Sequence, residues 1–216
     1  MIKPLIKPCF VFAVSILLLV SCGSDKTAQK QEKKTAINKE KDAGIYGYES
    51  GMVETHFGNT KNKEILFFDK WGTESACFTY SENRATGEVI LSAIKIQKGG
   101  TSYLIDPVEK TGLKMENAFG QADLGDAKKI LGYQEERKLE MLGSHVVGTE
   151  NISGKKCKVW KDDAEEMGLT TYTHEGLVLK TIIDMFDEDI ISEATEIQLN
   201  IDIPKEKFEI PKGIKF

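Results

Sequence analysis

The sequence is poor in the residues that most often carry catalysis or bind metals. It has three histidines and four cysteines in 216 residues. His56, His145 and His174 lie far apart, and none belongs to a His-Glu-x-x-His motif or to a Cys/His pair, so the pattern gives a zinc site no support. No Gly-x-Ser-x-Gly elbow and no glycine-rich phosphate loop occurs. We therefore expect no catalytic residues, no metal and no cofactor, and a protein that is not an enzyme.

The sequence also lacks a basic excess and a long apolar run. Its formal net charge is −5, and no Lys/Arg block lies beyond the amino-terminal tail, whereas nucleic-acid phosphates call for a basic face. We expect no nucleic-acid partner. The longest apolar run, Cys9 to Val20, is interrupted by Ser15, and it is shorter than the roughly 20 residues that a membrane-spanning helix needs. The run has the length of a signal-peptide core.

The first 22 residues have the three parts of a signal peptide. Lys3 and Lys7 give a positive start, the apolar run follows, and Ser21 is a small residue before Cys22. The stretch Leu19-Val20-Ser21-Cys22 resembles the lipobox of bacterial lipoproteins, in which the cysteine is acylated and becomes the first mature residue. The resemblance implies a signal peptide over 1–21 and a lipid anchor on Cys22. The alternative is an ordinary or uncleaved signal with a free Cys22.

Cleavage before Cys22 would remove two lysines and no acids, which changes the net charge from −5 to −7. Several acyl chains, at about 0.8 kcal/mol per buried CH₂, hold a protein on a bilayer. Residues 23–43 contain six lysines, four acids and hardly a large apolar side chain. Such a segment cannot offset its ordering entropy by burial, so we predict that 22–43 forms the lipidated cysteine and a flexible charged tether.

Residues 44–216 suit one domain whose pattern is mostly of period two, as in strands with one buried face. Turn residues, among them Gly99-Gly100, Gly154 and Glu175-Gly176, separate the runs at spacings typical of a meander of hairpins. The predicted strands are 47–57, 63–70, 74–81, 88–97, 101–106, 146–152, 155–161, 169–174, 177–186 and 193–203. In the last of these, Thr195, Ile197, Leu199, Ile201 and Ile203 are expected on one face, opposite Glu196, Gln198, Asn200 and Asp202.

One helix is predicted, between Ala122 and Gly143, with Asp123 as its N-cap. A helix between two groups of strands can cover one face of a sheet. The fold class is therefore α+β. We expect an open, half-closed antiparallel β-barrel of about ten strands, with helical segments covering its concave face.

Apolar and aromatic residues are the remaining candidates for a site. In "EILFFDKWG" Ile65 and Phe67 fall on one face and Leu66 and Phe68 on the other. Most such residues only form a core, but ten strands with little helix offer more apolar concavity than the helix fills, which suggests an apolar cavity. The candidate lining residues are Ile65, Phe67, Leu179, Ile183, Met185, Leu199 and Ile201. Cys77 and Cys157 fit either a disulfide or two separate buried thiols.

Three stretches carry a resemblance to a family: "YESGMVETHFGNTKNKEILFFDKWGTES", "VGTENISGKKCKVWK" and "IPKEKFEIPKGIKF". They resemble uncharacterised bacterial lipoproteins that are similar to the periplasmic lipoprotein carrier and receptor (LolA/LolB-like) superfamily. The resemblance covers most of residues 46–216. It implies an unclosed barrel of about eleven strands, with helices capping an apolar cavity that accepts acyl chains. It implies no particular binding residue, since neither Arg84 nor Arg137 aligns with the arginine that holds the carrier lid.

Two functions follow as hypotheses. In the first, a membrane-anchored lipoprotein of the bacterial cell envelope binds a lipid, an acylated protein or another apolar ligand in the half-barrel. In the second, the domain is a non-enzymatic structural module with a filled core and an envelope protein partner. Gly23 after the cysteine is consistent with the outer membrane in the best-known sorting rule for lipoproteins.

Overall fold

The computed structural model describes residues 45–116, 134–162, 168–185 and 188–216. The predicted signal peptide, Cys22 and the tether over 22–43 lie outside these residues. All described residues belong to one unit, residues 33–216. Among them, no helix is long and apolar enough to cross a membrane.

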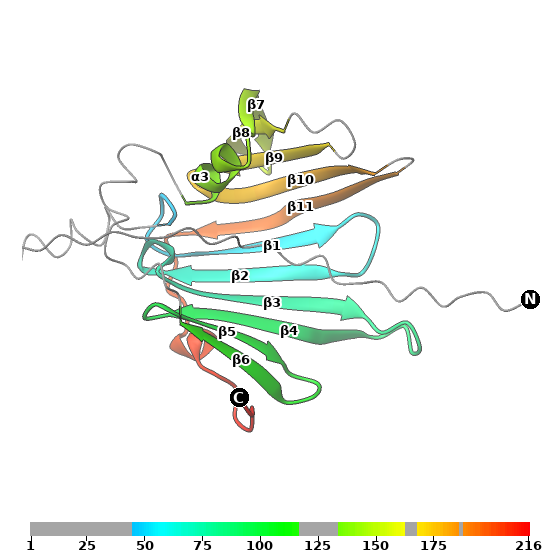
Figure 1. Ribbon diagram of the computed structural model, residues 1–216, viewed down its shortest axis with the longest axis vertical. Helices are drawn as coiled ribbons and strands as arrows, with labels where there is room; N and C mark the ends of the chain where they lie inside the picture. The colour runs from blue at the N-terminus through cyan, green and yellow to red at the C-terminus, as the bar shows by residue number, and fades with distance from the viewer. Residues whose placement is uncertain (1–44, 117–133, 163–167, 186–187) are drawn as a thin grey trace, which may run out of the picture. The chain divides into compact units, whose positions relative to one another are not determined.

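Eleven antiparallel strands form one sheet, in the order β6-β5-β4-β3-β2-β1-β11-β10-β9-β8-β7 (Figure 1). The chain runs outward from β1 to β6, and then returns from β7 to β11, which pairs with β1. β6 and β7 are the two end strands, so the sheet is open. The strand bounds are β1 Gly51–Phe57, β2 Lys63–Asp69, β3 Glu74–Glu82, β4 Val89–Lys98, β5 Thr101–Asp106, β6 Thr111–Glu116, β7 His145–Ile152, β8 Lys155–Lys161, β9 Leu169–His174, β10 Leu177–Met185 and β11 Glu188–Leu199.

Helical structure in the described part is limited to α3 (Gln134–Met141) and two 3₁₀ turns, η1 (Lys70–Gly72) and η2 (Lys205–Phe208). The described fold is mostly β. α3 confirms the end of the helix predicted over 122–143, and the rest of that prediction lies outside the described residues. Within the residues that the structure describes, the expected helical segments over the concave face are not shown. The one α-helix there, α3, contacts an end of the sheet through β8 and β9.

Tight turns explain why consecutive strands pair with their neighbours. Gly99–Gly100, Ser153–Gly154 and Glu175–Gly176 are two-residue loops in which both φ angles are positive. This conformation matches the twist of the flanking strands. The structure confirms the sequence prediction for all three turns.

The pairing register sorts the side chains onto two faces, because residues opposite each other on neighbouring strands point to the same side. We call face 1 the side of Val53, Leu66, Cys77, Lys95, Leu104 and Leu113. Face 2 is the side of Met52, Phe67, Ala76, Ile96, Tyr103 and Lys114. The prediction that Leu66 and Phe68 lie opposite Phe67 is confirmed.

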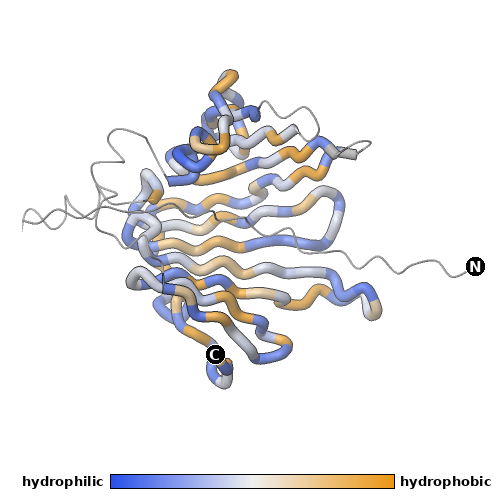
Figure 2. Tube along the Cα trace, in the orientation of Figure 1, coloured by the Kyte–Doolittle hydropathy of each residue, from blue (hydrophilic) through white to orange (hydrophobic). Residues whose placement is uncertain are grey.

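The apolar core consists of two clusters. Cluster 1 contains Val53, Phe68, Ile152, Cys157, Val159, Tyr172, Leu177, Leu179 and Ala194, with Tyr46, Tyr48, Leu66, Ile182, Ile197 and Leu199 packed against them. Cluster 2 contains Ala76, Ile94, Ile96, Ile105 and Phe208, with Phe67, Phe78, Leu91, Tyr103, Ile203 and Ile214 around them. Cluster 2 lies on face 2 and is covered by the C-terminal segment 200–216, which supplies Ile203, Phe208 and Ile214. Figure 2 shows how the hydrophobic residues concentrate within the strands.

Two strand predictions are wrong in detail. The sequence prediction omits β6. It therefore gives ten strands, whereas the sheet has eleven. The last strand starts earlier than predicted and ends at Leu199, because Asn200 takes a positive φ of 55° and turns the chain. Ile203 therefore packs in cluster 2, whereas Leu199 packs in cluster 1. The expectation of one shared face from Thr195 to Ile203 fails for this reason.

Candidate functional site

Face 1 carries a mostly apolar row that crosses the sheet from its middle to its β6 end, interrupted at β4 by the exposed Lys95. Val53 and Phe68 are buried, and Leu66 and Leu104 are half-buried. The register then places Leu113 of β6 opposite Leu104. Leu113 is 63% exposed. The row thus begins inside cluster 1 and ends in solvent.

Apolar and polar residues alternate along β6, and its large apolar side chains are exposed to solvent. Leu113 and Met115 lie on face 1, with Met115 opposite Ser102, and Met115 is 48% exposed. Lys114 and Glu116 lie on face 2. An exposed strand that serves only to end a core usually turns its polar side chains to water. Here face 1 of β6 presents two large apolar side chains to the solvent.

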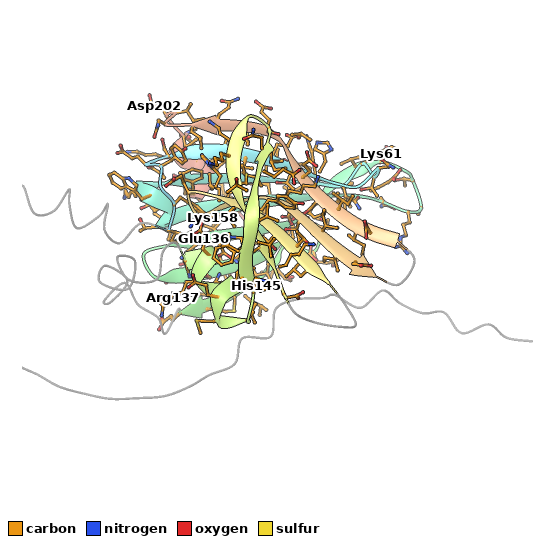
Figure 3. All side chains as sticks on the ribbon, turned by 90° about the horizontal axis from the view of Figure 1, so that it is seen from above. Lys61, Glu136, Arg137, His145, Lys158 and Asp202 are labelled. Atoms are coloured by element: carbon orange, nitrogen blue, oxygen red, sulfur yellow. The ribbon has the colours of Figure 1, made fainter. Side chains whose placement is uncertain are left out.

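A buried polar network attaches α3 to face 1 at the other end of the sheet. The Trp160 indole N–H donates to Thr173 Oγ1 over 2.8 Å, and the Thr173 hydroxyl donates to Glu136 Oε1 over 3.0 Å. Lys158 Nζ donates to Glu136 Oε2 over 2.6 Å. The Glu136 side chain is only 3% exposed. Both carboxylate oxygens are thus satisfied, as a buried charge requires (Figure 3).

Sequence reasoning missed this network. Glu136 is 37 positions from Thr173 and 22 from Lys158. α3 turns Glu136 as well as Leu139 inward, whereas a polar residue in a helix is normally expected on the wet side. No local signal in the sequence identifies a buried glutamate of this kind.

The seven predicted lining residues do not share one face. Ile65 and Phe67 lie on face 2, whereas Leu199, opposite Gly51, lies on face 1. Ile183 alternates with Ile182 along β10, which places it on face 1 as well. Leu179 lies at a shift of the pairing register between Val178 and Lys180, and it is buried in cluster 1. Met185 ends β10, and Ile201 follows the end of β11. Their role in lining a cavity stays a prediction.

The two cysteines of the domain are free thiols in the structure. Cys77 lies on face 1 of β3, and Cys157 is buried in β8. Burial is the main cause that raises the pKa of Cys77 to about 12, helped by the carboxylate of Glu64. Burial likewise raises the pKa of Cys157. Thiols held in their protonated form are poor nucleophiles, so neither has the environment of a reactive cysteine.

The three histidines remain apart in the fold. His56 Nε2 lies 2.9 Å from Glu54 Oε1 on face 2. His174 Nδ1 lies 2.9 Å from the Lys156 carbonyl oxygen, to which it donates, and its Nε2 lies 2.7 Å from the Tyr48 hydroxyl. His145 begins β7. In the part of the chain that the structure describes, no group of three His, Cys, Asp or Glu side chains could hold a metal ion.

The chain resembles known proteins in structure but not in sequence. No protein-family model and no curated protein sequence matches the chain. An uncharacterized conserved protein from Thermus thermophilus is similar at 6% identity and a TM-score of 0.46, over 86% of this chain and 98% of that one. The complex of MucA and MucB from Pseudomonas aeruginosa gives 10% identity and a TM-score of 0.47.

The match to that complex covers 83% of this chain and 61% of the other chain, so this chain spans less than two thirds of its length. LprF from Mycobacterium bovis is similar at 11% identity and a TM-score of 0.34, over 80% of this chain and 97% of that one. With identities and TM-scores this low, the likenesses assign no function to this chain.

Proposed function

We propose that the chain is a lipid-anchored envelope lipoprotein that binds a lipid or another apolar ligand on face 1 of its open sheet. Cys22 is the proposed anchor, and the outer membrane is the proposed destination. The lipobox-like segment supports the anchor, and the apolar row of face 1 supports the ligand. No step of this function requires a catalytic residue, and we propose that the protein is not an enzyme.

The observation that carries the ligand proposal is the exposed end of the apolar row. Leu113 and Met115 continue face 1 beyond the buried Val53 and Phe68. Burying a side chain of this size is worth about 1.5–3 kcal/mol. An acyl chain laid along face 1 would gain part of this free energy from each residue, because Leu113 is 63% and Met115 48% exposed.

Ligand binding is tested with the Cys22→Ser protein, which has no acyl chain of its own. Native mass spectrometry should detect co-purifying lipid, and a fluorescent fatty acid should be taken up. Leu113→Asp together with Met115→Asp should weaken uptake at least about tenfold, since two apolar contacts are lost. Val108→Asp is the matched control, because Val108 is 58% exposed in the turn before β6 and should leave uptake unchanged.

A protein without co-purifying lipid that also takes up no fatty acid would contradict the ligand proposal. The anchor has a separate test. Cells grown with an alkyne-labelled palmitate should label the protein, and Cys22→Ser should abolish the label. A label that survives this substitution would rule out Cys22 as the anchor.

A further inference from the structure

Lys95 of β4 is the charged residue in the apolar row of face 1. The register places it between Cys77 of β3 and Leu104 of β5. Its side chain is exposed, whereas Ile94 and Ile96, on face 2 of the same strand, are buried in cluster 2. Figure 1 shows β4 two strands from the β6 end of the sheet. β4 therefore contributes core side chains to one face and a cation to the other.

The ammonium group of Lys95 has no carboxylate partner within the described residues. Two lysines on face 2 differ from it in this respect. Lys63 Nζ lies 3.2 Å from Glu54 Oε2, and Lys180 Nζ lies 2.8 Å from Glu193 Oε2. The charge of Lys95 is thus available to an anion that does not belong to the described chain.

Two neutral hydrogen-bonding side chains lie beside Lys95 on face 1. Gln97 is two positions further along β4, and it lies opposite Ser75 of β3. Both side chains are half-buried, and neither makes a hydrogen bond within the part of the chain that the structure describes. An ammonium with an amide N–H₂ and a hydroxyl beside it can donate to the oxygens of an anion. We call Lys95, Gln97 and Ser75 the polar centre of face 1.

The acids on face 1 of β2 to β5 lie on the other side of Lys95. Glu64 of β2 and Asp106 of β5 are two residues from its row, in the direction away from Gln97. Glu64 Oε1 accepts from the Thr79 hydroxyl over 3.0 Å, and Asp106 Oδ1 accepts from two backbone N–H groups of the next turn, both over 2.9 Å. Four residues, about 13 Å, separate these acids from the row of Gln97, which exceeds the screening length of about 8 Å in physiological salt. An anion beside Gln97 therefore meets Lys95 before it meets either acid.

The polar centre determines which apolar ligands suit face 1. An uncharged ligand would remove water from the Lys95 ammonium and supply no partner, which costs free energy. An anionic headgroup would pair with the ammonium and accept from Gln97. A carboxylate carries one charge, which one lysine balances, whereas a phosphate monoester carries about −1.5 to −2. The polar centre therefore favours a carboxylate.

The cover on face 1 determines the direction of the acyl chain. On the β2 side, Tyr46 packs edge-on against Phe68 at 4.7 Å between ring centroids, so this chain covers that part of the face. On the β6 side, Leu113 and Met115 are exposed. β6 lies two strands from Lys95, a distance of about 10 Å. A ligand with its headgroup at the polar centre thus finds free apolar surface toward β6.

We propose that the ligand of face 1 is a fatty acid, whose carboxylate binds at the polar centre and whose acyl chain lies across β5 and β6. The acyl chain contacts Leu104, Leu113 and Met115. This inference rests on the proposed binding of an apolar ligand to face 1, and it names the class of that ligand. Lys95 is the residue that distinguishes an anionic amphiphile from a neutral lipid.

Two probes of equal chain length test the proposal on the Cys22→Ser protein, the parent for all variants. One is a fatty acid with a fluorophore at the end of its chain, and the other is the methyl ester of the same molecule. Fluorescence titration should show that the parent binds the acid at least about tenfold more tightly than the ester, because only the acid pairs with the ammonium. Lys95→Met removes the charge and keeps the length of the side chain. It should lose about tenfold in affinity for the acid and bind both probes equally.

Three further variants separate charge from packing. Lys95→Arg keeps a cation and should keep the preference for the acid. Gln97→Leu removes one donor and should weaken binding of the acid about fivefold. Lys98→Met is the matched control, since Lys98 is an exposed lysine of the same strand on face 2, and both of its affinities should equal those of the parent. The circular dichroism spectrum of each variant should match that of the parent.

The outcomes distinguish this proposal from the one on which it rests. A parent that binds acid and ester equally overturns the carboxylate site but leaves ligand binding on face 1 in place. A preference for the acid that survives in Lys95→Met also overturns the site, as does an equal loss of affinity for both probes in that variant. A parent that binds neither probe contradicts the ligand proposal itself, and the carboxylate site is then overturned with it.

Discussion

The two apolar clusters are built in different ways, although they share one sheet. Cluster 2 lies on face 2 of β2 to β5, under the C-terminal segment 200–216. Cluster 1 occupies face 1 at β1, β2 and β11, and continues at β8 and β9 with Val159 and Tyr172, which the register places on face 2. One strand, β2, contributes Phe68 to cluster 1 and Phe67 to cluster 2.

This difference shows which part of the sheet has apolar side chains that no other segment covers in the described residues. Toward β6, the C-terminal segment covers face 2, with Phe216 against Tyr103 at 5.7 Å between ring centroids. Face 1 of the same strands carries the exposed Leu113 and Met115. Near β6, the C-terminal segment of this chain covers face 2. Face 1 of the same strands is therefore the candidate surface for a ligand.

The largest expected effect is the removal of a side chain from the centre of cluster 1. Phe68 is fully buried and packs edge-on against Tyr46 at 4.7 Å between centroids. Phe68→Ala should lower the free energy of unfolding by about 3–5 kcal/mol, because it leaves a cavity. Urea denaturation followed by circular dichroism measures this loss. Val89→Ala, at an exposed site, should cost much less, and equal losses would contradict the assignment of Phe68 to the core.

Removal of a side chain from cluster 2 should have a more local effect, confined mainly to the C-terminal segment and the strands beneath it. Phe208 is 4% exposed and comes from η2 in the C-terminal segment. Phe208→Ala should cost about 3 kcal/mol, and should release the segment before the sheet unfolds. Hydrogen exchange should therefore rise across 200–216 and on β3 and β4 beneath it. A uniform rise that includes β10 and β11 would show that the two clusters unfold as one.

A glycine at the centre of cluster 1 gives an overpacking test. A Cβ on Gly51 would lie 2.6 Å from the Phe68 ring and 2.7 Å from the Gln198 carbonyl oxygen. Gly51→Ala should therefore cost about 1–3 kcal/mol in the free energy of unfolding. Gly148→Ala in β7 is the matched control, since nothing lies within 4 Å of its Cβ position. Destabilisation of the same size at Gly148 would contradict the packing explanation, because the lower entropy of the unfolded chain favours the folded state in both variants.

The hydrogen-bond network under α3 should contribute about as much to stability as the packing at Gly51. Thr173→Val keeps the shape of the side chain but removes the hydroxyl between Trp160 and Glu136, and should cost about 1–3 kcal/mol. The emission of Trp160 should change at the same time. Thr170→Val, at a half-buried threonine of the same strand that lies opposite Lys161 and on the other face, should leave that emission unchanged. If both variants melt alike with unchanged emission, the network does not hold α3.

The smallest effect is expected from the polar part of face 2. The hydrogen bond from His56, and then the ammonium of Lys63, hold the pKa of Glu54 below its usual value. Because the folded pKa is depressed, this stability is present above the pKa of the unfolded chain and is lost as the pH falls through the folded pKa. It should amount to less than about 1 kcal/mol. Glu54→Gln should flatten the free energy of unfolding over that acidic window, and an unchanged pH profile would contradict this.

Local patterns predicted much of the sheet. Alternation along 63–70 assigned Phe67 and Phe68 to opposite faces, and the glycine turns located three hairpins. β6 was missed because Thr111–Glu116 is short and carries only Leu113 and Met115 as large apolar residues. Ile203 was assigned to the wrong face, because the turn at Asn200 is not visible as a strand end in an alternating sequence.

The candidate site depended on contacts that no local pattern contains. Face 1 and face 2 become distinguishable only when eleven strands are in register, and Glu136 becomes buried only when Thr173 and Lys158 lie beside it. By itself, the sequence determined the strands, the hairpins and the lipobox-like segment, because each depends on neighbours a few positions apart. Only the tertiary structure decided which face the C-terminal segment covers and which apolar residues stay exposed, since burial depends on chain segments that are distant in the sequence.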